Sequence, residues 1–210
     1  MELSQKSLEE VHEIISECKR CTLSEGRTKT VPGSGDAKAA ILFIGEGPGK
    51  NEDLQGLPFV GAAGQFLTEL LGTIGLSRED VFIANVVKCR PPGNRDPLPE
   101  EVNACFPYLE RQVQLIDPLL IVTLGRHSMN RFIPGKQISA AHGKAFRREI
   151  EGLGKRVFFP IYHPAAALYR PQLKDEIIAD FVKVPALLNK IEAEQDKEQT
   201  TVEIEQKAMF

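Results

Sequence analysis

The four cysteines of this 210-residue chain fall into two pairs, Cys18 with Cys21 in the stretch CKRC, and Cys89 with Cys105 further on. A Cys-x2-Cys pair lets two thiolates bind one ion or cluster without backbone strain, and the second pair would complete a four-sulfur site. With sulfur ligands alone, the candidates are structural zinc or an iron–sulfur cluster, and the spacing does not decide between them. Four buried, unpaired thiols are the alternative, because free cysteine packs like a small apolar residue.

A glycine-rich loop, GEGPG (45–49), follows a short apolar run and raises the question of nucleotide binding. A phosphate-binding loop needs a hydroxyl residue after Gly-Lys, and here Asn51 stands in its place. The dinucleotide fingerprint also fails, because Lys50 replaces its third glycine. What remains is Glu46, a carboxylate directly after a predicted buried strand, although most glutamates are simply solvated loop residues.

Three more side chains could take part in the same chemistry. Phe59, in GLPFVG, is either a core residue or a platform on which a ring could stack. Asn85 lies inside the apolar stretch FIANVVK, where its amide must cap a loop or read the hydrogen-bonding edge of a ligand. His163, in YHP, is followed by Pro164, which directs the chain away from the strand; a lone histidine there is more often structural. The combination of acid, ring, amide and imidazole is the stronger argument for a site.

The elements that must position these residues alternate along the chain between short apolar runs and amphipathic segments. We expect helices from a capping box at Ser7 and Glu10, near Ala62, at Pro99 and after Arg126. A closing helix should cover residues 174–191, with Pro185 as a potential kink. Buried strands are predicted at residues 39–45, 81–89, 119–125 and 155–164.

This alternation predicts an α/β fold, a three-layer α/β/α domain with a central, mostly parallel four-stranded sheet over residues 1–190. In such sheets the ligand crevice lies at the carboxyl ends of the strands. Those ends carry GEGPG, NVVKC, TLG and YHP. The chemically distinctive sequence is therefore concentrated where a site belongs.

Composition leaves the class of partner open. Apolar residues make up 42% and charged residues 26%, as in ordinary globular proteins. The net charge of −3 is local, because the last twenty residues hold six acids and two bases; we expect 191–210 to be a charged, disordered tail. No run is long and apolar enough to cross a membrane, and the N-terminus is too polar for a signal peptide, so we expect a cytoplasmic protein without structural disulfides.

Three long motifs, with the four cysteines so spaced, resemble a known family: GEGPGKNEDLQGLPFVGAAG, ANVVKCRPPGNRDP and YHPAAALYR. They look like those of family-4 uracil-DNA glycosylases, the iron–sulfur members of the uracil-DNA glycosylase superfamily. The resemblance runs from about residue 18 to about residue 190. It implies excision of uracil from single- or double-stranded DNA at the start of base excision repair, and a mainly structural [4Fe–4S] cluster held by Cys18, Cys21, Cys89 and Cys105.

The resemblance also implies roles in breaking the glycosidic bond. Glu46 would lie near the sugar, positioning the attacking water or stabilising positive charge, with Gly47 and Pro48 beside it in the substrate loop. Gly47 stands where other branches have an aspartate, which makes water activation through Glu46 less firmly implied than uracil binding. His163 would contact O2 of the departing base. Donors aimed at that oxygen stabilise the charge that collects there.

Recognition of the base is assigned by the same resemblance. Phe59 would stack on the flipped uracil, and Asn85 would pair with its N3–H and O4. Glu52 matches the position thought to crowd C5 and so to exclude the methyl group of thymine. A mismatched amide would reject cytosine, because its pairing edge has the opposite donor pattern.

The segment HPAAALYRPQ (163–172) matches the loop that enters the minor groove in this superfamily. Leu168 or Tyr169 would fill the vacated stack, with Arg170 near a phosphate; an ordinary helix start is the alternative. Cross-linking relatives carry an arginine-rich insert, and PGKQISAAHGKAF contains His142 without one, which favours a turnover enzyme. We expect a monomer. A redox-sensing binding module for replication or repair partners, and a glycosylase that also removes hypoxanthine, are the rival functions.

Overall fold

The computed structural model describes residues 3–208, and the side chains of residues 3–197. Its single sheet has the spatial order β1-β3-β2-β4-β6-β5. The inner strands β3, β2, β4 and β6 are parallel, and β1 and β5 pair antiparallel at the two edges. The strands are β1 (Ser34–Gly35), β2 (Ile41–Gly45), β3 (Phe82–Asn85), β4 (Leu120–Leu124), β5 (Phe146–Ile150) and β6 (Gly154–Ile161).

The four predicted strands and their mostly parallel arrangement are confirmed, and the sheet has two further strands at its edges. Strand β1 has only two residues, and β5, with the sequence FRREI, keeps most of its side chains exposed. Neither segment has the continuous apolar run that identifies a buried strand. Both edge strands are therefore products of tertiary pairing, which sequence pattern alone does not reveal.

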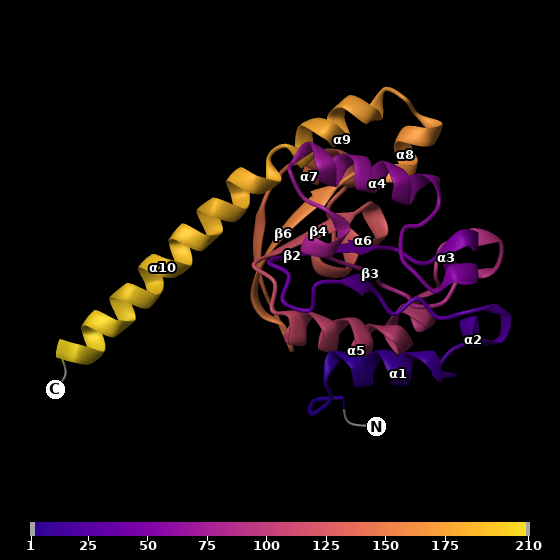
Figure 1. Cartoon of the computed structure of the whole chain (residues 1–210), viewed down its shortest axis with the longest axis horizontal. Helices are drawn as coiled ribbons and strands as arrows, with labels where there is room; N and C mark the ends of the chain where they lie inside the picture. The colour runs from indigo at the N-terminus through magenta and orange to yellow at the C-terminus, as the bar shows by residue number, and fades with distance from the viewer. Residues whose placement is uncertain (1–2, 209–210) are drawn as a thin grey trace.

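Helices cover both faces of the sheet, as the three-layer prediction requires (Figure 1). Alternate residues of β2 point to opposite faces: Leu42 and Ile44 pack with α1, α5 and α6, while Ile41 and Phe43 pack with α4 and α9. The helices are α1 (Leu8–Ser16), α2 (Leu23–Gly26), α3 (Lys50–Gln55), α4 (Ala62–Thr73), α5 (Pro99–Ile116), α6 (Arg126–Phe132), α7 (Ile138–Ala141), α8 (Pro164–Tyr169), α9 (Leu173–Phe181) and α10 (Val184–Ala208), with 3-10 turns η1 (Arg78–Asp80) and η2 (Pro92–Asn94).

The helix boundaries follow local chemistry. Helix α1 begins with the predicted capping box: the amide of Glu10 donates to Ser7 Oγ, and the amide of Ser7 donates to the carboxylate of Glu10. Pro99 occupies the first turn of α5, where its missing N–H has no helical partner to lose. Pro185 likewise lies in the first turn of α10, so the chain breaks into two helices instead of kinking one.

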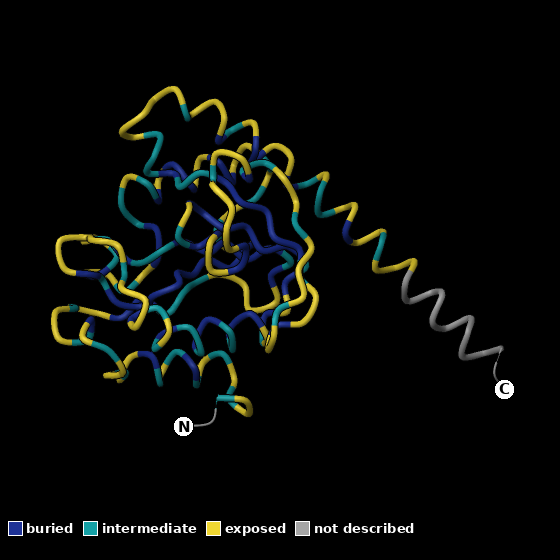
Figure 2. Tube along the Cα trace, turned by 180° about the vertical axis from the view of Figure 1, so that it is seen from behind, coloured by how far each residue is buried: buried dark blue, intermediate teal, exposed yellow. Residues whose placement is uncertain are grey.

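The C-terminal helix α10 projects away from the body of the molecule (Figure 1). Ile191, just past the predicted domain end at residue 190, is still buried in the core, and the following turns become exposed (Figure 2). Residues 191–208, which were predicted to belong to a disordered tail, are instead part of this helix; residues 209–210 lie outside the described part. Within the described residues, no helix combines the length and apolar character needed to cross a membrane.

Candidate active site and cysteine cluster

The carboxyl ends of the four parallel strands carry the predicted site residues. Asn85 ends β3 and lies opposite Gly45, the last residue of β2. Glu46 follows directly, and its carbonyl accepts a hydrogen bond from the amide of Val87 at 3.0 Å. His163 follows β6 and caps the start of α8. The carboxyl ends of the parallel strands therefore bring together residues that are far apart in the sequence. This is the place where parallel α/β sheets bind ligands.

Asn85 is a buried amide next to the end of β2. Its side chain is 1% exposed, and its Oδ1 has no hydrogen-bond partner among the described residues. A Cβ atom on Gly45 would lie 2.4 Å from this oxygen and 2.7 Å from the ring of Phe59. The glycine thus leaves room for the amide and the ring to approach the same point. A buried amide oxygen without a partner is costly, and it indicates a group kept for a ligand.

The loop carrying Phe59 is held in a strained conformation. Phe59 has a φ of 53°, in the left-handed region that costs a non-glycine residue about 1–2 kcal/mol. One oxygen of Glu52 accepts hydrogen bonds from the amides of Val60 and Gly61, both at 2.8 Å. Arg78 donates to the carbonyl of Phe59 at 3.1 Å. Glu52 therefore fixes the loop that presents the ring, and its predicted contact with C5 of the base stays a prediction.

His163 has its ring orientation and protonation set by its surroundings. The amide of Ala165 donates to Nδ1 at 3.1 Å, so the proton of the neutral ring lies on Nε2. Burial lowers the pKa of His163 to about 4, against a smaller opposing effect of Glu52. The imidazole also stacks with Phe59, with ring centroids 5.5 Å apart. The site thus contains a neutral imidazole that can donate one hydrogen bond from Nε2.

Glu46 is partly buried among charged groups that the sequence reasoning missed. The pKa of Glu46 is raised to about 7, mainly by burial and also by Asp96, while Arg126 has a smaller lowering effect. His127 Nε2 lies 3.8 Å from the Glu46 carboxylate and 3.1 Å from that of Asp96. The sequence did contain a signal that places Arg126 and His127 at the site, because both directly follow the TLG that ends the third predicted strand. Asp96 lies in the loop GNRDP, which nothing in the sequence linked to that strand end.

Gly47 and Pro48 continue the loop after Glu46. A Cβ on Gly47 would lie 2.8 Å from the side chain of Val87, so a larger residue would push the loop away from the end of β3. Pro48 is buried. Both residues shape the loop that holds Glu46, and their predicted contact with substrate stays a prediction.

The four cysteines line one small cavity between α1, α5 and the segment after β3. Cys89 and Cys105 are buried, and Cys18 and Cys21 are half-buried. Arg27 donates to Cys89 Sγ at 3.2 Å, and the amide of Lys88 donates to Cys105 Sγ at 3.3 Å. Such donors favour thiolate ligands, whereas burial, the largest effect, raises the pKa of Cys105 to about 12 although Lys88 lowers it. The environment therefore suits sulfurs that are bound to a cationic centre.

The chemistry of these ligands limits what the cavity could hold. Four sulfur donors fit either a structural zinc or an iron–sulfur cluster, and the donor set alone does not choose between the two.

The chain is also similar in sequence to known proteins. The sequence model of the uracil DNA glycosylase superfamily matches residues 32–183. A type-4 uracil-DNA glycosylase of Archaeoglobus fulgidus is 51% identical over 88% of this chain and 95% of that protein. This chain belongs to the uracil DNA glycosylase superfamily. Type-4 uracil-DNA glycosylases of Sulfurisphaera tokodaii and Thermotoga maritima are 49% and 43% identical, over 84% and 97% of those proteins and 86% and 87% of this chain.

Two further segments can be compared with what the resemblance to this superfamily implied. Leu168 and Tyr169, at the end of α8, are 50% and 86% exposed, and Arg170 is exposed beside them. An exposed apolar pair is compatible with the predicted DNA contact, which stays a prediction. The Nδ1 of His142 contacts the buried carboxylate of Asp180 at 2.6 Å. This superfamily member therefore uses His142 to join the end of α7 to α9.

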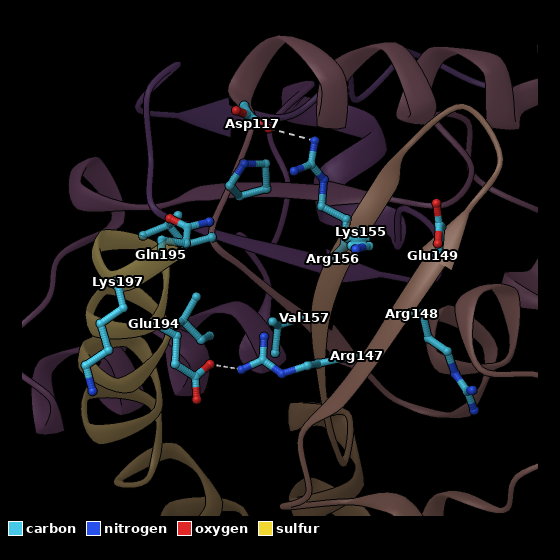
Figure 3. Close-up of a pocket in the computed structure, with 13 residues that line it drawn as sticks. Asp117, Arg147, Arg148, Glu149, Lys155, Arg156, Val157, Glu194, Gln195 and Lys197 are labelled. Carbon is cyan, nitrogen blue, oxygen red and sulfur yellow. Dashed lines mark hydrogen bonds and ion pairs between the residues drawn. The ribbon is translucent and has the colours of Figure 1, made fainter. Parts of the chain in front are cut away.

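A cavity of about 960 Å³ lies elsewhere, between the β5–β6 hairpin and α10 (Figure 3). Its walls include charged side chains that pair across it, Arg147 with Glu194 and Arg156 with Asp117. The cavity opens at the amino ends of β4 and β6, whereas Glu46 and Asn85 lie at the carboxyl ends of the strands. This cavity is thus separate from the candidate site residues at the carboxyl ends of the strands.

Proposed function

We propose that this protein is a uracil-DNA glycosylase, which extrudes uracil from DNA and hydrolyses its N-glycosidic bond as the first step of base excision repair. The observation that carries the proposal is the buried amide of Asn85, with its unpartnered oxygen, meeting the Phe59 ring over Gly45. The high identity to type-4 uracil-DNA glycosylases over most of both chains supports it.

Base recognition rests on the amide and the ring. A base inside a duplex cannot be reached, so it must be extruded at a cost of a few kcal/mol. Asn85 Oδ1 accepts from uracil N3–H while its amide nitrogen donates to O4, and cytosine presents the reverse pattern. Phe59 supplies the stacking surface. Glu52 holds the Phe59 loop and, at the position facing C5, excludes the methyl group of thymine.

Two groups act in the bond-breaking step: His163 as a hydrogen-bond donor and Glu46 as a negatively charged carboxylate. As the C1′–N1 bond breaks, its electron pair leaves with uracil, and Nε2–H of His163 donates to O2, where the negative charge collects. One well-placed donor of this kind is worth about 3 kcal/mol, or roughly 10²-fold in rate. The Glu46 carboxylate stabilises the cationic sugar and accepts the proton of the water that adds to C1′.

Contact with DNA is assigned to the end of α8. Tyr169 or Leu168 fills the space left by the extruded base, and Arg170 lies near a phosphate. Either single- or double-stranded DNA is a substrate, since both deliver the same extruded nucleotide. We further propose that the enzyme is a cytoplasmic monomer in which residues 1–190 form one domain.

The four cysteines are proposed to hold a [4Fe–4S] cluster. The similarity to type-4 uracil-DNA glycosylases supports this choice, and the donors to Cys89 and Cys105 favour the thiolate form that the ligands of such a cluster need. When bound, such a cluster would cross-link the N-terminal residues to α5 and the segment after β3. Because Lys88 also donates from its side chain to the carbonyl of Asn85 at 2.9 Å, this cross-link supports the strand end that carries the uracil-reading amide.

Replacing Asn85 by aspartate tests the proposal. The carboxylate cannot donate to O4, so uracil excision should fall at least 10²-fold and release of cytosine should become detectable. The assay is single-turnover cleavage of labelled oligonucleotides containing uracil, cytosine or hypoxanthine. Asn189→Asp, an exposed position on α10, is the matched control. Unchanged uracil excision without cytosine release would refute the reading role, and equal excision of hypoxanthine by the wild type would broaden the substrate class.

A further inference from the structure

An imidazole lies between two carboxylates at the edge of the site. His127 Nε2 is 3.1 Å from Asp96 and 3.8 Å from Glu46, and the three groups come from separate segments of the chain. All three facing atoms lie within 4.8 Å of one another. The nitrogen is buried and has no aligned hydrogen bond to another described residue. One ring nitrogen therefore faces both acids, with the carboxylate of Asp96 nearer than that of Glu46.

The cluster has a buried end and an exposed end. The side chains of Glu46 and His127 are 28% and 27% exposed, whereas those of Asp96 and Arg126 are 58% and 60% exposed. Arg126 donates to Asp96 at 2.7 Å and holds it at the solvent side. The charged and titratable groups that face Glu46 are thus Asp96, Arg126 and His127. Reaction chemistry at Glu46 must respond to these neighbours.

Each neighbour acts on the Glu46 charge in a definable direction. Asp96 is a like charge, so it disfavours the ionised form of Glu46. An N–H of His127 directed at the carboxylate favours the ionised form, because a hydrogen bond to an anion stabilises it. Burial and Arg126 lower the pKa of His127, which keeps the ring neutral near pH 7, while Asp96 opposes this effect.

We propose that His127 and Asp96 are positioning residues for uracil excision: His127 orients the Glu46 carboxylate and favours its ionised form, and Asp96 opposes that ionisation. The proposal rests on the function proposed above for Glu46. The rate of excision would then fall at low pH as Glu46 becomes protonated. The pH of this fall, the acid limb of the pH profile, would be set by His127 and Asp96, which need not touch the base.

The test is the pH profile of single-turnover excision from a uracil-containing single-stranded oligonucleotide. Asp96→Asn should move the acid limb to lower pH by about one pH unit, because a like charge is removed. His127→Leu should move it to higher pH by about the same amount, because a donor is lost. His127→Gln keeps an amide donor and should return the limb toward the wild-type position. Opposite shifts from two neighbouring substitutions are not expected from structural damage.

Controls separate this proposal from the one on which it rests. Asp117→Asn removes the same charge at the other end of the sheet and should leave the limb unchanged. Binding of an oligonucleotide with a stable abasic analogue, followed by fluorescence anisotropy, shows that each variant is folded. If Glu46→Gln is inactive but the Asp96 and His127 variants keep the wild-type limb, or shift it in the same direction, the positioning role is overturned while the function of Glu46 stands. A fully active Glu46→Gln would instead remove Glu46 from the chemistry.

Discussion

His163→Gln is the substitution whose consequences can be worked out furthest. Glutamine retains an amide donor and removes the titrating ring, so catalysis and the pH dependence of stability can be followed in the same variant. Because the donor of His163 is fixed by its Nδ1 contact with Ala165, and a glutamine cannot reproduce that contact, we expect excision to fall by about 10²-fold.

The stability effect follows from the pKa of His163, which burial lowers from about 6.5 in an unfolded chain to about 4. The unfolded state therefore binds a proton first as the pH falls. The contribution of His163 to the free energy of unfolding is fully present above about pH 6.5 and is lost as the pH falls toward the pKa of the folded state. Between about pH 7.5 and about pH 5, this group should lower the free energy of unfolding by at most about 2 kcal/mol, and by less to the extent that water reaches the half-buried ring.

The assay compares the two proteins in urea at each pH. The wild type should lose more stability than His163→Gln on acidification, by about 1–2 kcal/mol, since only the wild type carries this ring. Other titrating groups are common to both proteins and cancel in the difference. Equal loss in both proteins would show that the imidazole is not desolvated in the folded state. Excision near the wild-type rate would separately refute its role as the donor to O2.

Two further substitutions probe the space around the base and the cysteine cluster. Gly45→Ala would place a Cβ 2.4 Å from Asn85 Oδ1 and 2.7 Å from the Phe59 ring, so we expect a folded protein about 1–3 kcal/mol less stable with weakened uracil excision; a wild-type excision rate would contradict the tight contact. Cys89→Ala should lower the yield of folded protein and the visible absorbance much more than the rate per folded molecule, and a stable, colourless and active variant would contradict a structural role for the cluster.

The fold was predictable where one face or both faces of a segment are buried. The run ILFIG is apolar throughout because β2 is covered on both sides, and the capping box at Ser7 and Glu10 marks the start of α1 by local chemistry. The edge strand β5 has no such pattern, because its exposed residues include Arg147 and Arg148 and it is defined by pairing with β6.

The site was predictable for a similar reason and only in part. Asn85 and Glu46 each stand at the end of an apolar run, and parallel strands bring such ends together. The cluster of Asp96 with His127 depends on how a proline-rich loop crosses the end of β4, and no periodicity records that path. The bonds from Glu52 to the loop of Phe59 were also hidden, because they use backbone amides that every residue possesses.

The arrangement of glycines explains why four strands can share one small site. In the order β3-β2-β4-β6, the two central strands end at Gly45 and just before Gly125. Gly45 leaves space for Asn85 from β3, and Gly125, with a φ of 91°, lies with its Cβ position 3.0 Å from the Cβ of His163, which follows β6. Strands β3 and β6 thus carry side chains that pack against the backbone at the ends of β2 and β4. A side chain at Gly45 would displace Asn85, and one at Gly125 would displace His163, so both glycines shape the proposed site although neither offers a functional group.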